Sequence, residues 1–565
     1  MSEAALPRIA AAPRVSEATI LRASLWLAAL LLAIGLVLPL AVLLARAFMG
    51  SNDEFVGLAH FIAYVSTPSL LVSAWNSFWT AALTTLIVVP VAFFFAYGLT
   101  RSRMPARGLF RAVMLIPILA PSLLPALSLI YLFGNQGLFR FLMPEGSSIY
   151  GAPGIVMAQV IYTFPHAAII LAVALGMADA RLFEAAETLK ASRARIFRDV
   201  TLPAARYGLV SAAVVVFTLV MTDFGIPKVI GGQFPVLATD VYKQVIGQQN
   251  FSMGAVVAIV LLLPALFSFF AERWAQRMQS GAISGRAVLY VAKPRMARDA
   301  PLFLLCLLVA AVMIGSVAMA FWGSLIRFWP YNMTLTWANY DFSRFDSEGW
   351  GSLTTSLAMA GLAALFGTPV VFITAYLLER GAAGGLVSGF VRIAAIAPLA
   401  VPGLVLGLAY ILFFNHPANP LGFLYGTLAI LVLNCVVHFY TVAHLTAVTA
   451  IRQLDPEFEA VGASMRVPRW ITFGRVGVPI SRPAILEIAV YIFVNAMTTV
   501  SAVVFLYGPG SKPASVAVVQ MDEAGQVAAA AAMACVILGI TASVKIIQIG
   551  VVRAMSRKAG WRARG

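Results

Sequence analysis

Long apolar runs, separated by short polar segments, dominate the chain. In the first half they cover residues 25–45, 70–99, 109–133, 153–178, 206–227 and 254–271. In the second half they cover residues 301–324, 352–378, 389–414, 421–447, 482–506 and 527–551. A run of about 20 apolar residues is long enough to cross a bilayer as a helix. The pattern therefore predicts an all-α membrane protein with about 12 transmembrane helices.

Composition supports this prediction. Hydrophobic residues make up 61% of the 565 residues, charged residues only 11%, and the mean hydropathy is +0.90. A soluble domain of this size needs far more charge on its surface. The net charge of +16 does not indicate nucleic-acid binding here, because membrane proteins concentrate Lys and Arg in their cytoplasmic loops.

The distribution of Lys and Arg predicts the orientation. With the N-terminus in the cytoplasm, only a few of the 39 basic residues face outside, and these are Arg46, Arg140, Lys228, Lys243, Arg327, Arg344 and Lys512. The opposite orientation inverts this count. The positive-inside rule therefore places both termini in the cytoplasm, with an N-terminal tail over 1–24 and a basic C-terminal tail over 554–565.

The two halves are repeats of each other. Matches at an offset of 279 positions are Ser77 with Ser356, Pro90 with Pro369, Ala96 with Ala375, and Tyr97 with Tyr376. Both halves begin on the same side, so we expect parallel repeats over 25–276 and 301–553, joined by a cytoplasmic linker over 277–300. Prolines in the third and ninth runs, such as Pro121 and Pro402, predict kinked helices there.

A polar, basic stretch follows the fourth apolar run and again the tenth. The first, 184–203, reads EAAETLKASRARIFRDVTLP, and the second lies within 455–479. An acid in the first turn of a helix suits the helix dipole, and two alanines after it leave a small face for close docking. A short helix of this kind can sit in a groove of a soluble partner. The alternative interpretation is a solvated basic loop.

Both stretches resemble the EAA loop of permease subunits in binding-protein-dependent ABC importers, and we call them coupling loops 1 and 2. The residues that carry the resemblance in coupling loop 1 are Glu184, Ala185, Ala186, Lys190, Phe197 and Pro203. Those in coupling loop 2 are Glu459, Ala460, Arg466, Phe473 and Pro479. The family's glycine falls on Lys190 and Arg466, and the acid of the second copy stands one residue early.

The resemblance implies a fused permease with two six-helix repeats of the ABC importer (MetI-like) type, in a bacterial inner membrane. It implies two copies of an ATPase subunit, which hold ATP and Mg, and one periplasmic solute-binding protein. The sequence contains no phosphate-binding Gly-x-x-x-x-Gly-Lys-Ser/Thr loop, since Gly508–Lys512 lacks that spacing. We therefore expect neither a catalytic residue nor a bound cofactor in this chain.

The resemblance also suggests a substrate. The segments 222–232 and 240–250 look most like permeases assigned to 2-aminoethylphosphonate uptake, while ferric iron, thiamine and polyamines remain alternatives within the same class. A secondary transporter of the major-facilitator type is the competing class. It requires a Gly-Asp-Arg-Arg loop after the second run, and the corresponding segment 98–108 has no acid.

Polar residues inside the apolar runs are candidates for the translocation path, because they are costly in a membrane unless they face a cavity or a partner. They are Asn76, Thr222, Asp223, Asn495, Thr498 and Thr499. Alternatively, Asp223 pairs with Lys228 near the outer interface, and a lone Asn joins neighbouring helices. His438 and His444 lie six positions apart, and the three cysteines lie in apolar runs, so we expect no metal site.

Overall fold

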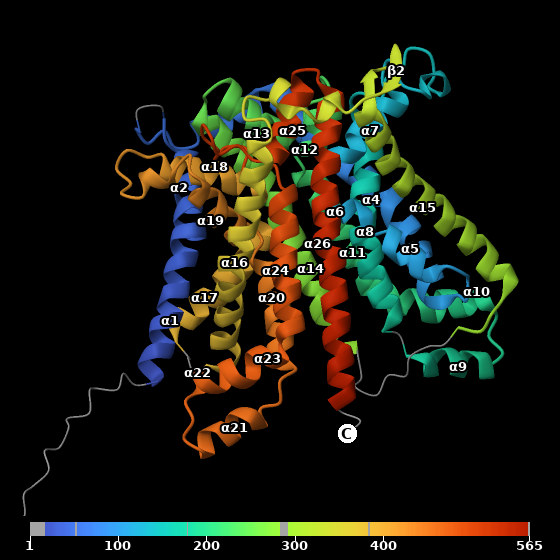
Figure 1. Cartoon of the computed structure of the whole chain (residues 1–565), viewed down its shortest axis with the longest axis vertical. Helices are drawn as coiled ribbons and strands as arrows, with labels where there is room; N and C mark the ends of the chain where they lie inside the picture. Colours follow the sequence, from blue (N-terminus) through green and yellow to red (C-terminus); the bar gives the residue numbers. More distant parts are fainter. Residues whose placement is uncertain (1–16, 51–52, 178, 283–291, 382–384, 563–565) are drawn as a thin grey trace, which may run out of the picture.

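The computed structural model describes residues 17–50, 53–177, 179–282, 292–381 and 385–562, and within them the chain is a bundle of long helices (Figure 1). The helices of the first repeat are α1 (Glu17–Leu32), α2 (Leu38–Arg46), α3 (Ala59–Ser66), α4 (Pro68–Arg101), α5 (Arg107–Val113), α6 (Ile116–Leu119), α7 (Leu123–Phe133), α8 (Ala152–Gly176), α9 (Ala180–Thr188), α10 (Arg193–Ile196), α11 (Leu202–Thr222), α12 (Gly225–Ile230), α13 (Leu237–Tyr242) and α14 (Phe251–Ala282).

The second repeat follows the same plan. Its helices are α15 (Met296–Leu325), α16 (Gly351–Arg380), α17 (Leu386–Ile396), α18 (Gly403–Phe414), α19 (Leu428–His438), α20 (Tyr440–Arg452), α21 (Glu457–Ser464), α22 (Arg469–Thr472), α23 (Val478–Ile480), α24 (Arg482–Thr498), α25 (Ala514–Glu523) and α26 (Val527–Arg562). A short antiparallel hairpin of β1 (Ile326–Phe328) and β2 (Asn332–Leu335) follows α15.

Eight helices in the described residues are long and apolar enough to cross a membrane, and four bent pairs bring the number of spans to 12. The prediction of an all-α membrane protein with about 12 spans is therefore confirmed. The sharpest bends, 98° between α6 and α7 and 117° before α18, fall in the third and ninth spans. Ala120 and Val401 are extended at these bends, because each precedes a proline, which disfavours helical geometry.

Two predicted spans end earlier than their apolar runs. The runs 206–227 and 482–506 were predicted as continuous spans, but α11 ends at Thr222 and α24 at Thr498. After each break the chain turns back through a short helix, α12 or α25, at the end of the bundle opposite α9 and α21 (Figure 1). Helices also enter the predicted linker and C-terminal tail, because α14 runs to Ala282 and α26 to Arg562. Residues 1–16 and 283–291 lie outside the described residues.

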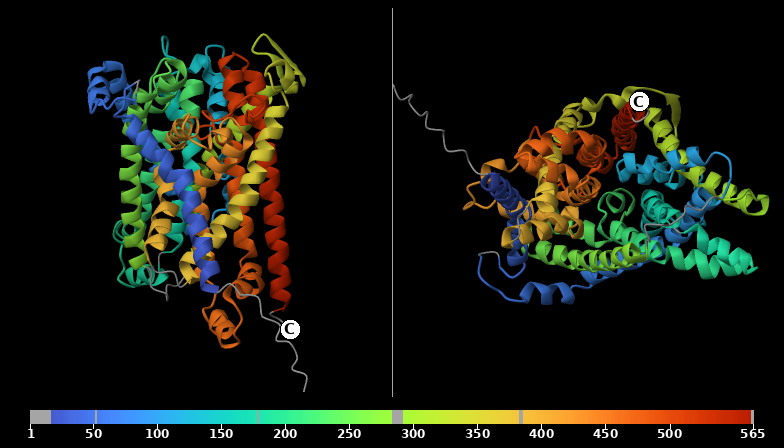
Figure 2. Two further views of the ribbon diagram at one scale, coloured as in Figure 1. Left: turned by 90° about the vertical axis from the view of Figure 1, so that its left-hand side faces the viewer. Right: turned by 90° about the horizontal axis from the view of Figure 1, so that it is seen from below.

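The first span of each repeat packs against helices of the other repeat. α1 and α2 pack against α17 and α18, whereas α15 packs against α5 and α7 (Figure 2). The hydroxyl of Tyr410 in α18 donates to the carbonyl of Gly35 at 2.7 Å. The hydroxyl of Thr541 in α26 donates to the carbonyl of Leu119 in α6 at 2.5 Å. Buried hydrogen bonds therefore join the two repeats within the apolar core.

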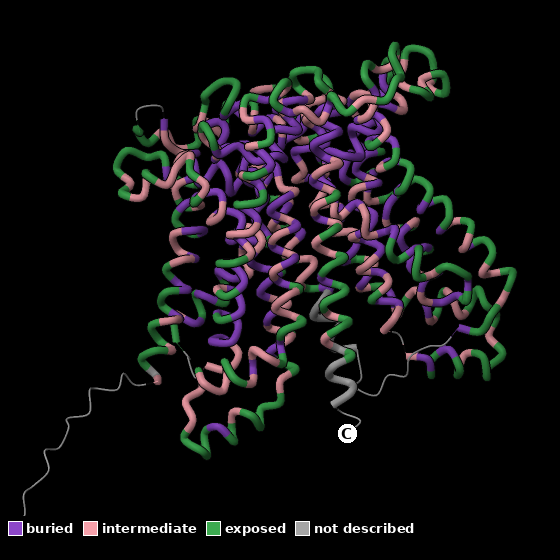
Figure 3. Tube along the Cα trace, in the orientation of Figure 1, coloured by how far each residue is buried: buried purple, intermediate pink, exposed green. Residues whose placement is uncertain are grey.

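Burial is densest at the end that carries α12, α13 and α25, while the helices toward α9 and α21 expose more of their outer faces (Figure 3). Equivalent serines hold this end in both repeats. Ser77 in α4 accepts a hydrogen bond from Leu237 N at 2.8 Å, and Ser356 in α16 accepts one from Ala514 N at 2.8 Å. These bonds fix the backbone that follows each break, because a buried N–H without a partner costs about 1–3 kcal/mol.

Candidate functional site

Coupling loops 1 and 2 lie at the same end of the bundle, where α9 and α21 run across the ends of the long helices (Figure 1). In the first loop Asp179 accepts a hydrogen bond from Arg181 N at 3.1 Å and Ser192 accepts one from Arg195 N at 3.4 Å, so side chains cap α9 and α10. In the second loop Glu459 lies in the first turn of α21, whereas the prediction that Glu184 begins a helix was wrong, because α9 already starts at Ala180 and has no acid in its first turn. Both loops are therefore helix–turn–helix segments.

The turn of each loop contains a residue with left-handed backbone geometry. Lys190 has φ 52° and Arg466 has φ 56°, and these are the positions at which the family pattern has glycine. A residue with a Cβ pays about 1–2 kcal/mol for this conformation, whereas glycine adopts it freely. The glycine-type turn thus persists in both loops although neither copy has the glycine.

An aromatic socket anchors the end of each loop. The Phe197 ring lies 6.0 Å from both Phe93 and Tyr97 of α4, measured between ring centroids. The Phe473 ring lies 5.8 Å from Phe372 and 4.3 Å from Tyr376 of α16. The α4 and α16 residues match at the repeat offset of 279 positions.

The two loops also continue alike after these rings. A π-helical segment follows in each case, over Phe197–Thr201 and Phe473–Gly477, and leads to Pro203 or Pro479 in the first turn of the next helix. The socket rings belong to the second span of each repeat, so the end of each loop packs directly against that span.

The acids of the two loops occupy different surroundings. Glu184, like Ala185 and Ala460, is exposed. Glu459 is only partly exposed, and its Oε1 accepts a hydrogen bond from the hydroxyl of Tyr376 at 3.2 Å. The shift of the second acid by one residue therefore turns it toward the aromatic socket, away from the outer face of the loop.

Two arginines support the loops and were missed by sequence reasoning. Arg101 Nη2 donates to the carbonyl of Leu175 at 2.6 Å, and its guanidinium lies 4.6 Å from the ring centroid of Phe183 in α9. Arg380 Nη2 donates to the carbonyl of Ile451 at 3.1 Å. Arg101 and Arg380 are separated by the same 279 positions as the other matches between the repeats. This repeated arginine could have been recognised in the sequence as a candidate for supporting the loops.

Asp223 lies at the break between α11 and α12. It accepts hydrogen bonds from Gln159 Nε2 and from Ile226 N, both at 2.9 Å. Lys228 pairs instead with Glu523 of α25. The alternative in which Asp223 pairs with Lys228 is therefore wrong, because the carboxylate faces α8 and the first turn of α12.

The other path candidates form hydrogen bonds within their own repeat. Asn76 Nδ2 donates to the carbonyl of Pro235 at 3.0 Å and joins α4 to the segment before α13. Thr222, Asn495 and Thr498 donate to carbonyls one helical turn back, and the carbonyl of Thr499 accepts from Ser515 at 2.5 Å. Among the described residues, no hydrogen bond connects the 222–223 patch with the 495–499 patch.

In each repeat a glycine packs closely against a serine near the broken spans, but the two residues have swapped positions between the repeats. A Cβ on Gly225 would lie 2.7 Å from Ser122 Oγ, and a Cβ on Gly403 would lie 2.7 Å from Ser501 Oγ. Ser122 corresponds to Gly403 at an offset of 281, and Gly225 corresponds to Ser501 at an offset of 276. Each close contact therefore requires a glycine. In the first repeat the glycine follows the fifth span, and in the second repeat it lies in the ninth span.

Within the described ranges, no three His, Cys, Asp or Glu side chains lie close enough together to hold a metal ion. His438 ends α19 whereas His444 belongs to α20, and the chain bends by 53° between these helices. Cys306 and Cys435 are buried and Cys535 is partly buried, and all three are free thiols.

Comparison with known proteins gives two matches to one family model. The model described as "Binding-protein-dependent transport system inner membrane component" matches residues 88–280 and 381–557. Each matched segment contains one coupling loop.

Individual relatives are also similar to this chain. One from Haemophilus influenzae, named as a ferric transport system permease protein (FbpB 1), is 29% identical over 435 residues, covering 74% of this chain and 68% of the relative. The ferric transport system permease protein FbpB of Actinobacillus pleuropneumoniae is 27% identical over 471 residues, covering 80% and 67%. The molybdenum transport system permease protein ModB of Mycobacterium tuberculosis is 31% identical over 205 residues, covering 36% and 78%.

Proposed function

The chain belongs to the family of inner-membrane components of binding-protein-dependent transport systems, and we propose that it forms the translocation path of an ATP-driven importer. The observation that carries this proposal is the duplicated loop, in which a phenylalanine after the surface helix packs against aromatic rings of the second span of its repeat. A surface helix linked to a membrane helix in this way suits the transfer of motion from a soluble partner.

In this proposal two ATPase subunits hold ATP and Mg and bind coupling loops 1 and 2. Closure of the ATPase dimer displaces α9 and α21, and the aromatic sockets pass that displacement to α4 and α16. The repeats then open at the end that carries α12 and α25, where a periplasmic binding protein delivers the solute. Hydrolysis returns the chain to the closed arrangement. Both termini and both loops lie in the cytoplasm, as the distribution of Lys and Arg favours.

Ferric iron is the substrate that the relatives favour, since two of them are named for ferric transport. The segments 222–232 and 240–250, which resemble permeases for 2-aminoethylphosphonate, favour that solute as a second candidate. The two candidates differ in chemistry, since one is a metal cation and the other a zwitterion with a phosphonate group. Thiamine and polyamines belong to the same importer class and serve as further ligands to test.

The test is ATPase activity of the chain reconstituted in nanodiscs with its ATPase and binding-protein partners. We expect the binding protein loaded with its solute to stimulate hydrolysis, and the ligand that stimulates identifies the substrate. Stimulation by ferric iron alone would exclude the phosphonate, and the reverse result would exclude iron. Proton-driven uptake by the lone chain, with no bound ATPase, would contradict the importer proposal.

A further inference from the structure

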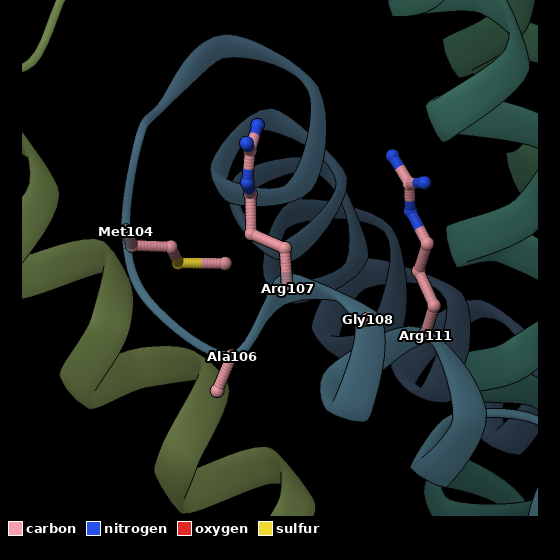
Figure 4. Close-up of a pocket in the computed structure, with 5 residues that line it drawn as sticks. All are labelled: Met104, Ala106, Arg107, Gly108 and Arg111. Atoms are coloured by element: carbon pink, nitrogen blue, oxygen red, sulfur yellow. The ribbon is translucent and has the colours of Figure 1, made fainter.

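A basic cavity lies beside the turn between α4 and α5. It has a volume of about 480 Å³ and is lined by Met104, Ala106, Arg107, Gly108 and Arg111. The side chains of Arg107 and Arg111, one helical turn apart, extend to the same side of α5 (Figure 4). Arg101, the last residue of α4, contacts Phe183 of α9. The cavity therefore lies at the end of the bundle that carries the coupling loops.

The charge in this cavity is not balanced by the protein. Arg107 Nη1 donates to the carbonyl of Ser102 at 3.0 Å, a neutral partner. The side chain of Arg111 is exposed and forms no hydrogen bond or ion pair within the part of the chain that the structure describes. The carboxylate that contacts this turn belongs to Asp299, which accepts from Arg103 N and pairs with Arg298.

In the second repeat the corresponding arginine has an acidic partner. Arg392 corresponds to Arg111 at an offset of 281 and pairs with Glu379 at 3.6 Å. Glu379 corresponds to Thr100 at an offset of 279, and the Thr100 hydroxyl donates only to the carbonyl of Ala96. The first repeat has therefore kept the arginine and lacks the acid, so Arg111 has no counter-charge among the described residues and is open to an anion from outside the chain.

The position of the cavity indicates the source of that charge. α5 is the first helix of the bent third span. Leu109, between the two arginines, is 61% exposed in the described structure. Met296, at the start of the adjacent α15, is 85% exposed. Exposed apolar side chains beside unpaired arginines at the end of a span match the boundary between lipid tails and headgroups.

We propose that this cavity binds the phosphate headgroup of an anionic phospholipid, with Arg107 and Arg111 as its cationic ligands. Arginine suits this role because its planar guanidinium donates two parallel hydrogen bonds to phosphate oxygens. A lipid bound here contacts the turn that joins the second span to the third, next to the Arg101 contact with α9. Membrane composition thereby acts on the base of coupling loop 1, whereas in the second repeat Arg392 has Glu379 as its partner.

Native mass spectrometry of the purified chain tests the proposal, with phosphatidylglycerol and phosphatidylcholine as probes. We expect the wild-type chain to prefer phosphatidylglycerol, and Arg111→Gln to weaken that binding about fivefold, since one basic residue near a membrane surface contributes about that much. Arg111→Lys keeps the charge and should retain most of the binding. Arg553→Gln removes an exposed arginine from α26 and serves as the matched control.

A second variant tests the unpaired charge of Arg111 by adding an acidic partner. Thr100→Glu places the acid of the second repeat beside Arg111, and we expect it to weaken phosphatidylglycerol binding about as much as Arg111→Gln. Equal lipid binding by wild type, Arg111→Gln and Thr100→Glu would overturn the proposal. Displacement of the lipid by inorganic phosphate at equal concentration would also overturn it, because the site would then be one for free anions.

Discussion

Lys228 of α12 forms an ion pair with Glu523 of α25, and this pair joins the two repeats at the end opposite the coupling loops. The ammonium of Lys228 also lies 4.6 Å from the ring centroid of Tyr242, whose ring stacks on Phe505 at 6.0 Å between centroids. The breaks after α11 and α24 place these side chains across from each other. In an alternating-access cycle, this contact has to separate for the solute to enter.

A covalent link in place of this ion pair should therefore arrest transport. We expect Lys228→Cys with Glu523→Cys, joined by a bifunctional methanethiosulfonate reagent that spans the length of the two lost side chains, to lower solute uptake at least tenfold, because the repeats are then held together at this end. Reduction with dithiothreitol should restore uptake. The two single variants are the controls, and full uptake by the cross-linked double variant would show that this end does not open.

The same contact should depend on pH through Asp522. Its burial, together with the negative charge of Glu523, raises the pKa of Asp522 from its usual 3.8 to about 7, and Lys228 opposes this shift. Because the pKa in the folded protein exceeds the unfolded value, the folded state is favoured when Asp522 is protonated, and this advantage is lost as pH rises through 7. We expect the melting temperature to fall between pH 6 and pH 8.5.

Asp522→Asn provides the comparison for this pH dependence. The amide stays neutral at every pH, so the decrease in melting temperature between pH 6 and pH 8.5 should become smaller than in the wild type. Glu523→Gln removes the neighbouring charge and should reduce the decrease partly. An unchanged pH profile in Asp522→Asn would assign the effect to another group.

The repeats, the spans and the kinks could be predicted from the sequence because each depends on a local pattern. Runs of about 20 apolar residues define spans, and a proline disfavours helical geometry at the residue before it, as at Ala120 and Val401. The ends of the fifth and eleventh spans were predicted incorrectly because the chain stays apolar and buried after each break, at Ile226 and Pro227 in α12 and over residues 502–506 in the turns that follow α24. Hydropathy does not distinguish such a buried short helix or turn from the end of a long span.

The contacts of single polar residues were beyond sequence reasoning for a different reason. Asp223 has Lys228 nearby in sequence but is satisfied by Gln159, 64 positions earlier. Lys228 finds Glu523 in the other repeat. Such pairs are decided by the packing of distant helices, whereas the sequence offers only the nearest opposite charge.

Lys190 and Arg466 should accept glycine at no cost. Both are in the left-handed region, so Lys190→Gly removes strain of about 1–2 kcal/mol from the turn of coupling loop 1. We expect this variant to keep transport and to slow amide exchange of Ala191, whose N–H bonds to Ala186 at 3.0 Å. Lys190→Val is the contrasting variant and should speed exchange, because a β-branched side chain is poorly tolerated at positive φ. Faster exchange in the glycine variant would show that the side chain, and not the backbone, stabilises the turn.

The acids of the two coupling loops have unequal surroundings. Glu184 is exposed whereas Glu459 accepts a hydrogen bond from Tyr376, so Glu184 is free to contact an ATPase and Glu459 braces its own socket. We expect Glu184→Lys to lower ATP-coupled uptake at least tenfold while membrane insertion and melting temperature stay unchanged.

Glu459→Gln should behave differently, since an amide oxygen still accepts from the Tyr376 hydroxyl. We expect nearly normal uptake, whereas Glu459→Ala should lower the melting temperature, because it removes a partly buried hydrogen bond that contributes about 1 kcal/mol. The measurements are uptake per ATP hydrolysed and thermal unfolding at equal expression. Normal coupling in Glu184→Lys, or a larger loss of coupling in Glu459→Gln, would reverse the roles of the two loops and place the dominant ATPase contact on α21.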